Sequence, residues 1–346
     1  MPIKVLIVDD SLQFREDLSK AMSSDPAIEI VGTAANAAEA EEKLKELKPN
    51  VMTLDVELPK ESGISFLKRI LKTYPVPTVV VTCAPTSAFE AMNAGAVDFV
   101  KKPETTSQQD LQRFSARLRQ AVKIASISKV KTENVSVPTA SKPVSTNLEG
   151  YKVNPLTAKD KIIALGASTG GTDALQAVVQ DLPADTPGII ITQHMPPVFT
   201  KMYAERLNRI CKMSCKEAED GDRVERGRII VAAGGFHLRL CKDANGYFVS
   251  SKKGEKVSGH CPSVDVMFES VAKTAGKNAI GAILTGMGAD GAKGLKKMRE
   301  AGAFTIGQDK ESCVVYGMPM VAFNTGAVCR QAPLTEIPKI ILEQLK

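Results

Sequence analysis

The sequence has no apolar run long enough to cross a membrane. A membrane-spanning helix needs roughly 18 or more consecutive apolar residues, and no stretch of the 346 residues approaches that length. The first apolar segment, residues 3–8, runs directly into Asp9 and Asp10, which is unlike the apolar core of a secretory signal. We therefore expect a cytoplasmic protein with no direct membrane insertion.

The sequence also lacks the patterns of a zinc site, a disulfide framework or a nucleic-acid interface. Its seven cysteines are odd in number and scattered, and the only close pair, Cys211 and Cys215, has no second pair or histidine at zinc-site spacing. The formal net charge is +6, but Lys and Arg are spread along the chain without a dense basic run. We expect reduced thiols and no nucleic-acid partner.

The order of apolar segments predicts two α/β domains, the first at residues 1–125. At 346 residues the chain exceeds the usual size of one domain. Segments rich in Val and Ile alternate with helical patterns, which predicts a parallel sheet covered by helices on both faces. The expected strands of the first domain are residues 5–8, 28–31, 51–54, 79–81 and 97–100.

A flexible linker and a second α/β domain are expected after the first. Residues 126–157 are dominated by Ser, Thr, Lys, Val and Pro, a composition typical of linkers. Alternation then resumes over residues 158–346 and predicts a doubly wound, mainly parallel sheet. The expected strands are residues 162–165, 189–192, 229–232 and 280–284, with helical patterns at 173–179 and 293–300.

Acidic residues follow two strands of the first domain. Asp9 and Asp10 come after the first strand and Asp55 after the third. The carboxyl ends of strands in an open parallel sheet form its ligand crevice, and crowded carboxylates there favour a hard cation such as Mg²⁺. Thr82 and Lys102 reach the same edge, where they could contact phosphate oxygens.

Asp9 and Asp10 taken alone have a second interpretation. Carboxylates beside Ser11 could cap the helix that follows, because negative charge is favoured at a helix N-terminus. However, Asp55, Thr82 and Lys102 are expected at other strand ends of the same edge. When the acidic pair is considered together with them, a metal pocket is favoured over a helix cap.

The motifs VLIVDDS, LDVELP, VVVTCA and DFVKKP resemble those of response-regulator receiver domains. The resemblance covers the first domain and implies a flavodoxin-like (βα)5 fold, with Asp55 phosphorylated by a chemotaxis histidine kinase. It implies a Mg²⁺ site formed by Asp9, Asp10, Asp55 and the backbone carbonyl of Glu57. The implied switch residues are Thr82, Phe99 and Lys102.

The second domain contains the pattern of a serine nucleophile. Ser168 lies in Gly166-Ala-Ser-Thr-Gly-Gly171, a G-x-S-x-G motif between a predicted strand and a predicted helix. Backbone N–H groups at such a helix start are available to an oxyanion. His194 ends the next strand and Asp290 follows another, so all three groups of a serine triad are expected at one sheet edge.

The residues around Ser168 allow other interpretations. G-x-S-x-G alone also occurs in tight turns and phosphate-binding loops. A dinucleotide site is disfavoured, because Ser168 stands at the middle glycine of the fingerprint. We expect His237 to be structural. His260 lies in a loop that could line the cleft expected around Ser168, His194 and Asp290.

The stretches GASTGG, QHMP, GHCPSVDVMF, ILTGMGADG and CVVYGMP closely resemble the catalytic domain of chemotaxis protein-glutamate methylesterases. The resemblance covers residues 161–346 and implies Ser168 as nucleophile, His194 as general base and Asp290 as the orienting acid, with oxyanion donors at Thr169 and Met287. Cys261 stands where the family usually has arginine, which leaves the role of that position open here.

The two resemblances together imply a phosphorylation-activated serine hydrolase. Its implied substrates are glutamate γ-methyl esters on methyl-accepting chemoreceptors, with deamidation of receptor glutamines as a second activity. We expect a monomer that uses Mg²⁺ in the receiver and no cofactor for ester hydrolysis. The alternative is a phospho-dependent adaptor with an inactive hydrolase fold, whereas a DNA-binding output is disfavoured by the lack of a helix-turn-helix pattern.

Overall fold

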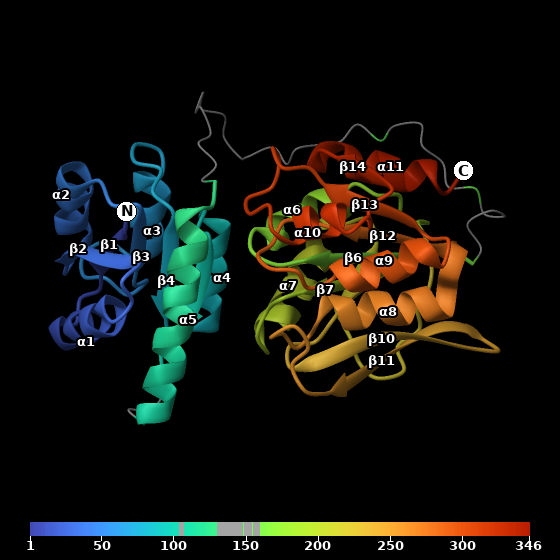
Figure 1. Cartoon of the computed structure of the whole chain (residues 1–346), viewed down its shortest axis with the longest axis horizontal. Helices are drawn as coiled ribbons and strands as arrows, with labels where there is room; N and C mark the ends of the chain where they lie inside the picture. The colour runs from blue at the N-terminus through green and yellow to red at the C-terminus, as the bar shows by residue number, and fades with distance from the viewer. Residues whose placement is uncertain (104–106, 130–147, 149–153, 155–159) are drawn as a thin grey trace. The chain divides into compact units, whose positions relative to one another are not determined.

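The computed structural model describes residues 1–103, 107–129, 148, 154 and 160–346. The chain divides into two compact units, Met1–Thr139 and Ala140–Lys346, and each is described here by itself. Both are α/β units in which helices flank a sheet (Figure 1). Most of the expected linker, residues 126–157, lies outside the described residues.

Five parallel strands form the sheet within residues 1–103 of the first unit, in the order β2-β1-β3-β4-β5. All five expected strands are present, and the second extends three residues beyond its predicted end. The strands are β1 (Ile3–Val8), β2 (Ile28–Ala34), β3 (Val51–Leu54), β4 (Thr78–Thr82) and β5 (Asp98–Lys101). The helices are α1 (Leu12–Ser23), α2 (Ala37–Leu47), α3 (Gly63–Ile70), α4 (Pro85–Asn93) and α5 (Gln108–Ser126).

Strand β1 shows why these strands are continuous apolar runs. Leu6 belongs to a buried cluster that includes Phe66 of α3, whereas the next residue, Ile7, belongs to a second cluster that includes Leu118 of α5. Because successive strand residues point to opposite faces and helices cover both faces, the buried positions 5–8 are all apolar, whereas Lys4 near the start of the strand is exposed. The expected flavodoxin-like fold class is confirmed.

Seven parallel strands form the sheet within residues 160–346, in the order β14-β13-β12-β6-β7-β9-β8. The strands are β6 (Ile162–Ala167), β7 (Ile189–Gln193), β8 (Ser214–Glu217), β9 (Arg228–Val231), β12 (Ala279–Ile283), β13 (Phe304–Gln308) and β14 (Arg330–Ala332), and an antiparallel hairpin adds β10 (Phe236–Asp243) and β11 (Gly246–Lys253).

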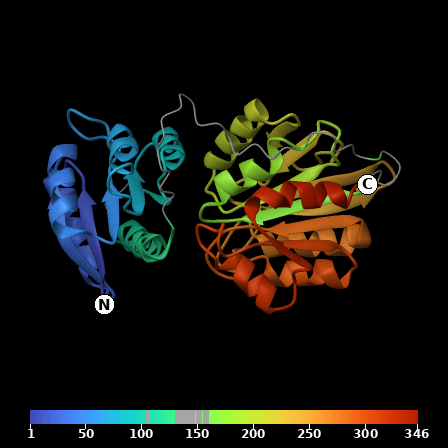
Figure 2. The same ribbon diagram turned by 90° about the horizontal axis from the view of Figure 1, so that it is seen from above.

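Helices cover both sides of this second sheet (Figure 2). They are α6 (Gly171–Val179), α7 (Phe199–Ile210), α8 (Val264–Ala275), α9 (Ala292–Glu300), α10 (Met318–Asn324) and α11 (Ile337–Glu343), with short 3-10 turns at Gly276–Asn278 and Leu334–Glu336. The expected doubly wound, mainly parallel sheet is confirmed. None of the helices in the described part of the chain has the length and apolar character needed to cross a bilayer.

In both sheets the first strand of the unit has later strands on both of its sides, so the strand order reverses at that strand. In the first unit β1 pairs with both β2 and β3, and in the second β6 pairs with both β7 and β12. Ligand crevices of doubly wound sheets form at the carboxyl ends of such strands. The predicted site residues that follow β1, β3, β6, β7 and β12 therefore gather at two sheet edges.

Candidate functional site

Three carboxylates gather at the carboxyl edge of the first sheet. One carboxylate oxygen from each of Asp9, Asp10 and Asp55 lies within 4.8 Å of the others. Asp9 and Asp55 are buried and Asp10 is exposed. The Lys102 ammonium donates hydrogen bonds to Asp9 Oδ2 at 2.7 Å and to Asp55 Oδ2 at 2.6 Å. The cluster is thus a set of hard oxygen ligands, and the Lys102 ammonium is hydrogen-bonded to two of the three carboxylates.

Burial and ion pairing act in opposite directions on these groups. Burial raises the pKa of Asp9 above its ordinary value, although the hydrogen bond from Lys102 opposes the shift. Burial would lower the pKa of Lys102, but its hydrogen bonds to Asp55 and Asp9 outweigh burial and raise it. Lys102 therefore carries its positive charge throughout the neutral range.

The other expected receiver residues lie near this edge. Thr82 ends β4, is buried, and accepts a hydrogen bond from the Ala84 N–H at 3.3 Å. Phe99 on β5 is partly buried against the cluster that includes Leu54. The Glu57 N–H donates to Asp55 Oδ1 at 3.3 Å, which places the Glu57 backbone beside the cluster.

The helix-capping interpretation of Asp9 and Asp10 is only partly right. Ser11 is the N-cap of α1, and its hydroxyl accepts a hydrogen bond from the Phe14 N–H at 3.3 Å. Asp9 supports that cap by accepting from the Ser11 N–H at 3.0 Å. One contact absent from the sequence interpretation is that Lys102 Nζ lies 4.5 Å from the centre of the Phe14 ring, a cation–π geometry.

Ser168 lies on a tight turn between β6 and α6 whose glycines are sterically required. Gly170 has φ of 75°, a conformation costly for other residues. A Cβ on Gly171 would lie 2.2 Å from Gln193 Oε1. The Ser168 N–H donates to the Thr285 carbonyl at 3.0 Å, and the Ser168 carbonyl accepts from Gln193 Nε2 at 2.8 Å. The turn is therefore tied to both neighbouring strand ends.

His194 and Asp290 form a buried pair at the same edge. His194 Nε2 lies 2.7 Å from Asp290 Oδ2, and the two side chains are 7% and 2% exposed. Asp290 also accepts hydrogen bonds from the Ser263 hydroxyl at 2.8 Å and from the Val264 and Asp265 N–H groups at 2.7 and 3.0 Å. Val264 and Asp265 open α8, so the carboxylate lies at the positive end of a helix dipole.

The ionisation of Asp290 assigns the proton on the imidazole of His194. Burial would raise the pKa of Asp290, but the hydrogen bonds from His194, Ser263 and the start of α8 outweigh burial and lower it to about 2. A carboxylate accepts and cannot donate, so His194 Nε2 carries the hydrogen in this pair. The other ring nitrogen, Nδ1, is buried and has no hydrogen-bond partner among the described residues.

The Ser168 turn is joined to His194 through the backbone. The His194 N–H donates to the carbonyl of Ala167, the residue before Ser168, at 3.2 Å. Among the described side chains no hydrogen bond joins the Ser168 hydroxyl to His194. Such a bond is often long or absent in a substrate-free serine hydrolase.

The backbone around Ser168 leaves two expected oxyanion donors available. Among the described residues, no acceptor is found for the N–H groups of Thr169 and Met287. The Thr169 carbonyl is held by the Thr285 hydroxyl at 3.0 Å. Met287 lies in the loop between β12 and α9 and is 40% exposed.

Comparisons with known proteins match this two-unit arrangement. Residues 163–341 match the family model described as CheB methylesterase, and residues 5–113 match that of the response regulator receiver domain. The chain belongs to the CheB methylesterase family. The first match includes Ser168, His194 and Asp290, and the second includes the acidic cluster of the receiver unit.

Relatives in the CheB family align with nearly the whole chain. The protein-glutamate methylesterase/protein-glutamine glutaminase 2 of Syntrophomonas wolfei is 50% identical over 338 residues, covering 97% of this chain and 95% of the relative. The protein of that name from Syntrophotalea carbinolica is 45% identical, covering 98% and 97%. The crystal structure of the Thermotoga maritima CheB methylesterase catalytic domain is 39% identical with a TM-score of 0.52, covering 53% of this chain and 97% of that one.

Several residues of the CheB-family catalytic unit were missed by the sequence interpretation. Gln193, Ser263 and Thr285 hold the Ser168 turn or the Asp290 carboxylate through hydrogen bonds. Gln193 directly precedes His194, and Thr285 directly precedes the Gly-rich loop, but nothing in the sequence shows where their side chains point.

The two remaining histidines differ in their surroundings. His237 is structural, as expected: Nδ1 accepts from the Ser263 N–H at 3.3 Å and Nε2 lies 2.7 Å from the Glu255 carbonyl. The His260 ring stacks on that of His194, so His260 does reach the candidate site.

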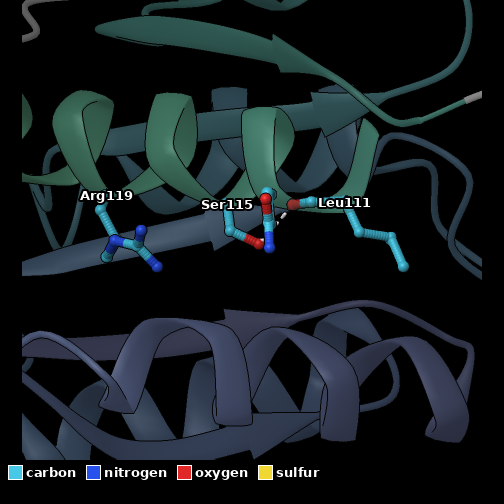
Figure 3. Close-up of a pocket in the computed structure, with 4 residues that line it drawn as sticks. Leu111, Ser115 and Arg119 are labelled. Carbon is cyan, nitrogen blue, oxygen red and sulfur yellow. Dashed lines mark hydrogen bonds between the residues drawn. The ribbon is translucent and has the colours of Figure 1, made fainter. Parts of the chain in front are cut away.

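A hollow of about 480 Å³ lies along α5. It is lined by Leu111, Gln112, Ser115 and Arg119, and Figure 3 shows the three labelled side chains on one side of α5. The Ser115 hydroxyl donates to the Leu111 carbonyl at 2.7 Å, and Arg119 Nη1 donates to the Ala21 carbonyl at 2.8 Å. These bonds lie within the receiver unit and indicate no chemistry of their own.

Proposed function

We propose that this CheB-family chain hydrolyses γ-methyl esters of glutamate on chemoreceptors, releases methanol, and deamidates receptor glutamines to glutamate. The observation that carries the proposal is the His194–Asp290 pair, whose buried imidazole has Nδ1 without a partner beside Ser168. The relatives named protein-glutamate methylesterase/protein-glutamine glutaminase support the substrate class.

The proposed reaction begins with the Ser168 hydroxyl. Its oxygen attacks the ester carbonyl carbon while His194 Nδ1 takes the hydroxyl proton. Asp290 holds Nε2–H, so the imidazole is oriented by one nitrogen and acts as base through the other. The N–H groups of Thr169 and Met287 are the proposed donors to the oxyanion, whose stabilisation is a large part of such catalysis.

Attack by Ser168 gives a tetrahedral intermediate, and two stages then complete the cycle. His194 returns its proton to the leaving oxygen, methanol departs, and a glutamyl ester remains on Ser168. Water, deprotonated by His194, then attacks that ester and restores Ser168 with receptor glutamate as product. With a glutamine substrate the first leaving group is ammonia. We propose no cofactor for this chemistry, because nucleophile, base and oxyanion donors all belong to the chain.

We further propose that Asp55 accepts a phosphoryl group from a chemotaxis histidine kinase. The oxygen set of Asp9, Asp10 and Asp55, with the Glu57 carbonyl, fits the preference of Mg²⁺ for hard ligands. Bound there, Mg²⁺ would neutralise charge on the carboxylates and on the incoming phosphoryl group. Lys102, which already contacts Asp55, would then contact a phosphoryl oxygen.

Phosphorylation is proposed to raise the hydrolase activity by releasing inhibition. In this scheme the unphosphorylated receiver, residues 1–125, packs over the Ser168 cleft, and the linker of residues 126–157 permits release of the catalytic domain, residues 158–346. Added negative charge at Asp55 would reposition Thr82 and Phe99 and weaken that packing. We propose that the protein acts as a cytoplasmic monomer.

The proposed function is tested by measuring the chemical change in the receptor. Methylated chemoreceptor membranes are incubated with wild type or Asp55→Asn, each with Mg²⁺ and with or without a small phosphodonor, and receptor peptides are analysed by mass spectrometry. We expect conversion of glutamyl methyl ester and of glutamine to glutamate, stimulated by phosphodonor only in the wild type. An unmodified receptor under every condition would refute the proposal and favour an adaptor role.

A further inference from the structure

The imidazole of His260 lies flat against that of His194. The ring centroids are 3.7 Å apart and the planes differ by 8°. Asp290 holds the His194 ring at one nitrogen only, so a second contact covers one whole face of the same ring. None of the proposed catalytic steps uses His260, and its contact with the base calls for a role of its own.

The backbone of His260 is firmly anchored in the loop before α8. The His260 N–H donates to the Val257 carbonyl and the Val257 N–H donates to the His260 carbonyl, both at 3.0 Å. The next residue, Cys261, accepts a hydrogen bond from the Gly235 N–H at 3.1 Å. The ring is thus presented to His194 from a loop that is fixed on both sides.

The same segment also holds the acid. Ser263, three residues after His260, donates its hydroxyl to Asp290, and the next two N–H groups donate to the same carboxylate. Residues 260–265 therefore contact the base twice, once at its ring face and once through the acid. A shift of this segment would change both contacts together.

The stacked His260 ring restricts rotation of the His194 ring, which the single hydrogen bond to Asp290 does not do. Rotation of a histidine ring about its last torsion is broad and weakly restricted, and one hydrogen bond at Nε2 leaves that rotation possible. A parallel ring at 3.7 Å blocks it and keeps Nδ1 directed to one place. An aromatic face also favours a neighbouring cation, which His194 becomes when it takes the serine proton.

Direct proton transfer between the two rings is disfavoured by the same geometry. A hydrogen bond between imidazoles needs the N–H of one ring to point at the nitrogen of the other, within the ring plane. Rings that are parallel to within 8° and face to face point their nitrogens away from each other. His260 therefore acts through its ring face.

We propose that His260 is a positioning residue, which holds the imidazole of His194 in the orientation that lets Nδ1 accept the Ser168 proton. This inference rests on the proposed function, since it concerns the base of that reaction. The positioning role requires a flat aromatic ring at position 260. A phenyl ring should therefore fulfil it, whereas a small side chain should not.

The experiment compares the full-length variants His260→Ala and His260→Phe with the wild type, in the presence of phosphodonor. Methanol release gives kcat and KM, and Lys256→Ala on the same exposed loop is the matched control. Because a small misplacement of a catalytic group can cost up to about 100-fold in rate, we expect kcat to fall at least ~10-fold in His260→Ala. KM should stay within about twofold, and His260→Phe should retain kcat within about threefold.

A second readout does not depend on activity. The chain has only three histidines, so ¹⁵N-histidine NMR can assign the Nε2–H signal of His194 by comparison with His194→Gln. We expect that signal to be protected from exchange in the wild type and in His260→Phe, and to be lost or broadened in His260→Ala. Thermal unfolding checks that each variant is folded.

The outcomes separate this inference from the proposed function. Unchanged kcat and an unchanged His194 signal in His260→Ala would overturn the positioning role, and so would His260→Phe being as impaired as His260→Ala. A wild type that hydrolyses no receptor ester would instead refute the proposed function. The NMR comparison would then still decide whether His260 orients His194.

Discussion

Asp290 shows how one residue combines a structural and a chemical role. Its carboxylate accepts four hydrogen bonds, from His194, the Ser263 hydroxyl and two N–H groups of α8. These bonds compensate for burial of a negative charge, which would otherwise be strongly unfavourable. The same bonds keep the carboxylate ionised, so that it can orient the imidazole at neutral pH.

A pH dependence of stability follows from this residue. The pKa of Asp290 is lowered in the folded protein from 3.8 to about 2, which corresponds to about 2 kcal/mol of stability for the ionised form. Because the folded pKa is the lower one, this contribution is present above pH 3.8 and is lost as the pH falls toward 2.

Asp290→Asn should therefore be less stable than wild type at pH 7 by at least about 2 kcal/mol. The difference should shrink as the pH falls below 4. Denaturant unfolding of both full-length proteins at pH 7 and at several pH values between 5 and 3 measures it. A difference that stays constant over that range would show that ionised Asp290 does not stabilise the fold as described.

At the scale of elements, the active edge depends on how the ends of β6, β7 and β12 are joined. Gln193 at the end of β7 donates Nε2 to the Ser168 carbonyl. Thr285, after β12, accepts the Ser168 N–H and donates its hydroxyl to the Thr169 carbonyl. The Ser168 turn is thus held by the strand ends on both of its sides.

Gln193→Met tests that arrangement. Methionine fills a similar volume but has no donor for the Ser168 carbonyl, and it also removes the Gln193 Oε1, which is buried without a hydrogen-bond partner. We expect little change in the free energy of unfolding, within about 1 kcal/mol, but a fall in kcat of about 10-fold with KM nearly unchanged. Methanol release and denaturant unfolding measure the two effects.

Gln176→Met is the matched control. Gln176 on α6 also has a buried Oε1 without a partner in the described part of the chain, and the one hydrogen bond of its amide found there goes to Gln180 rather than to the Ser168 turn. If both variants lost activity equally, the effect of Gln193→Met could not be assigned to its bond with Ser168.

The sequence predicted the central elements well and the peripheral ones poorly. Central strands such as β6 are buried on both faces, and their continuous apolar runs are easily recognised. The edge strand β8, SCKE, and the three-residue β14 lack such runs and were not predicted. The hairpin of β10 and β11 was also not predicted, and neither was β13, although four of its five residues are buried. A strand with few apolar residues is recognised only when its pairing partner is known.

The same reasoning applies to the candidate sites. Ser168, His194 and Asp290 could be predicted because each follows a strand, and parallel strand ends meet at one edge. The roles of Gln193 and of the His260 ring depend on side-chain directions within loops and strand ends. Sequence spacing does not specify those directions, so they became visible only in the three-dimensional structure.

At the scale of the whole molecule, two units with separate chemistry share one chain. The acidic cluster of Asp9, Asp10 and Asp55 belongs to the first unit, and the Ser168 turn belongs to the second. Each unit has its own sheet and its own buried core. Such an arrangement allows one unit to regulate the other without contributing residues to its reaction.

Removal of the receiver should therefore release the hydrolase. A fragment of residues 158–346 should demethylate receptors faster than the unphosphorylated full-length protein, and a phosphodonor should not stimulate it. Methanol release at matched protein concentrations measures the rates. If the fragment were no faster, inhibition by the receiver would be wrong.

Methanol release from methylated chemoreceptor membranes shows whether Ser168 carries out ester hydrolysis. Wild type is compared with Ser168→Ala and with Ser214→Ala, an exposed serine at the start of edge strand β8. We expect methanol release by wild type and by Ser214→Ala, and loss of nearly all of it in Ser168→Ala. Equal release by Ser168→Ala and wild type would contradict it.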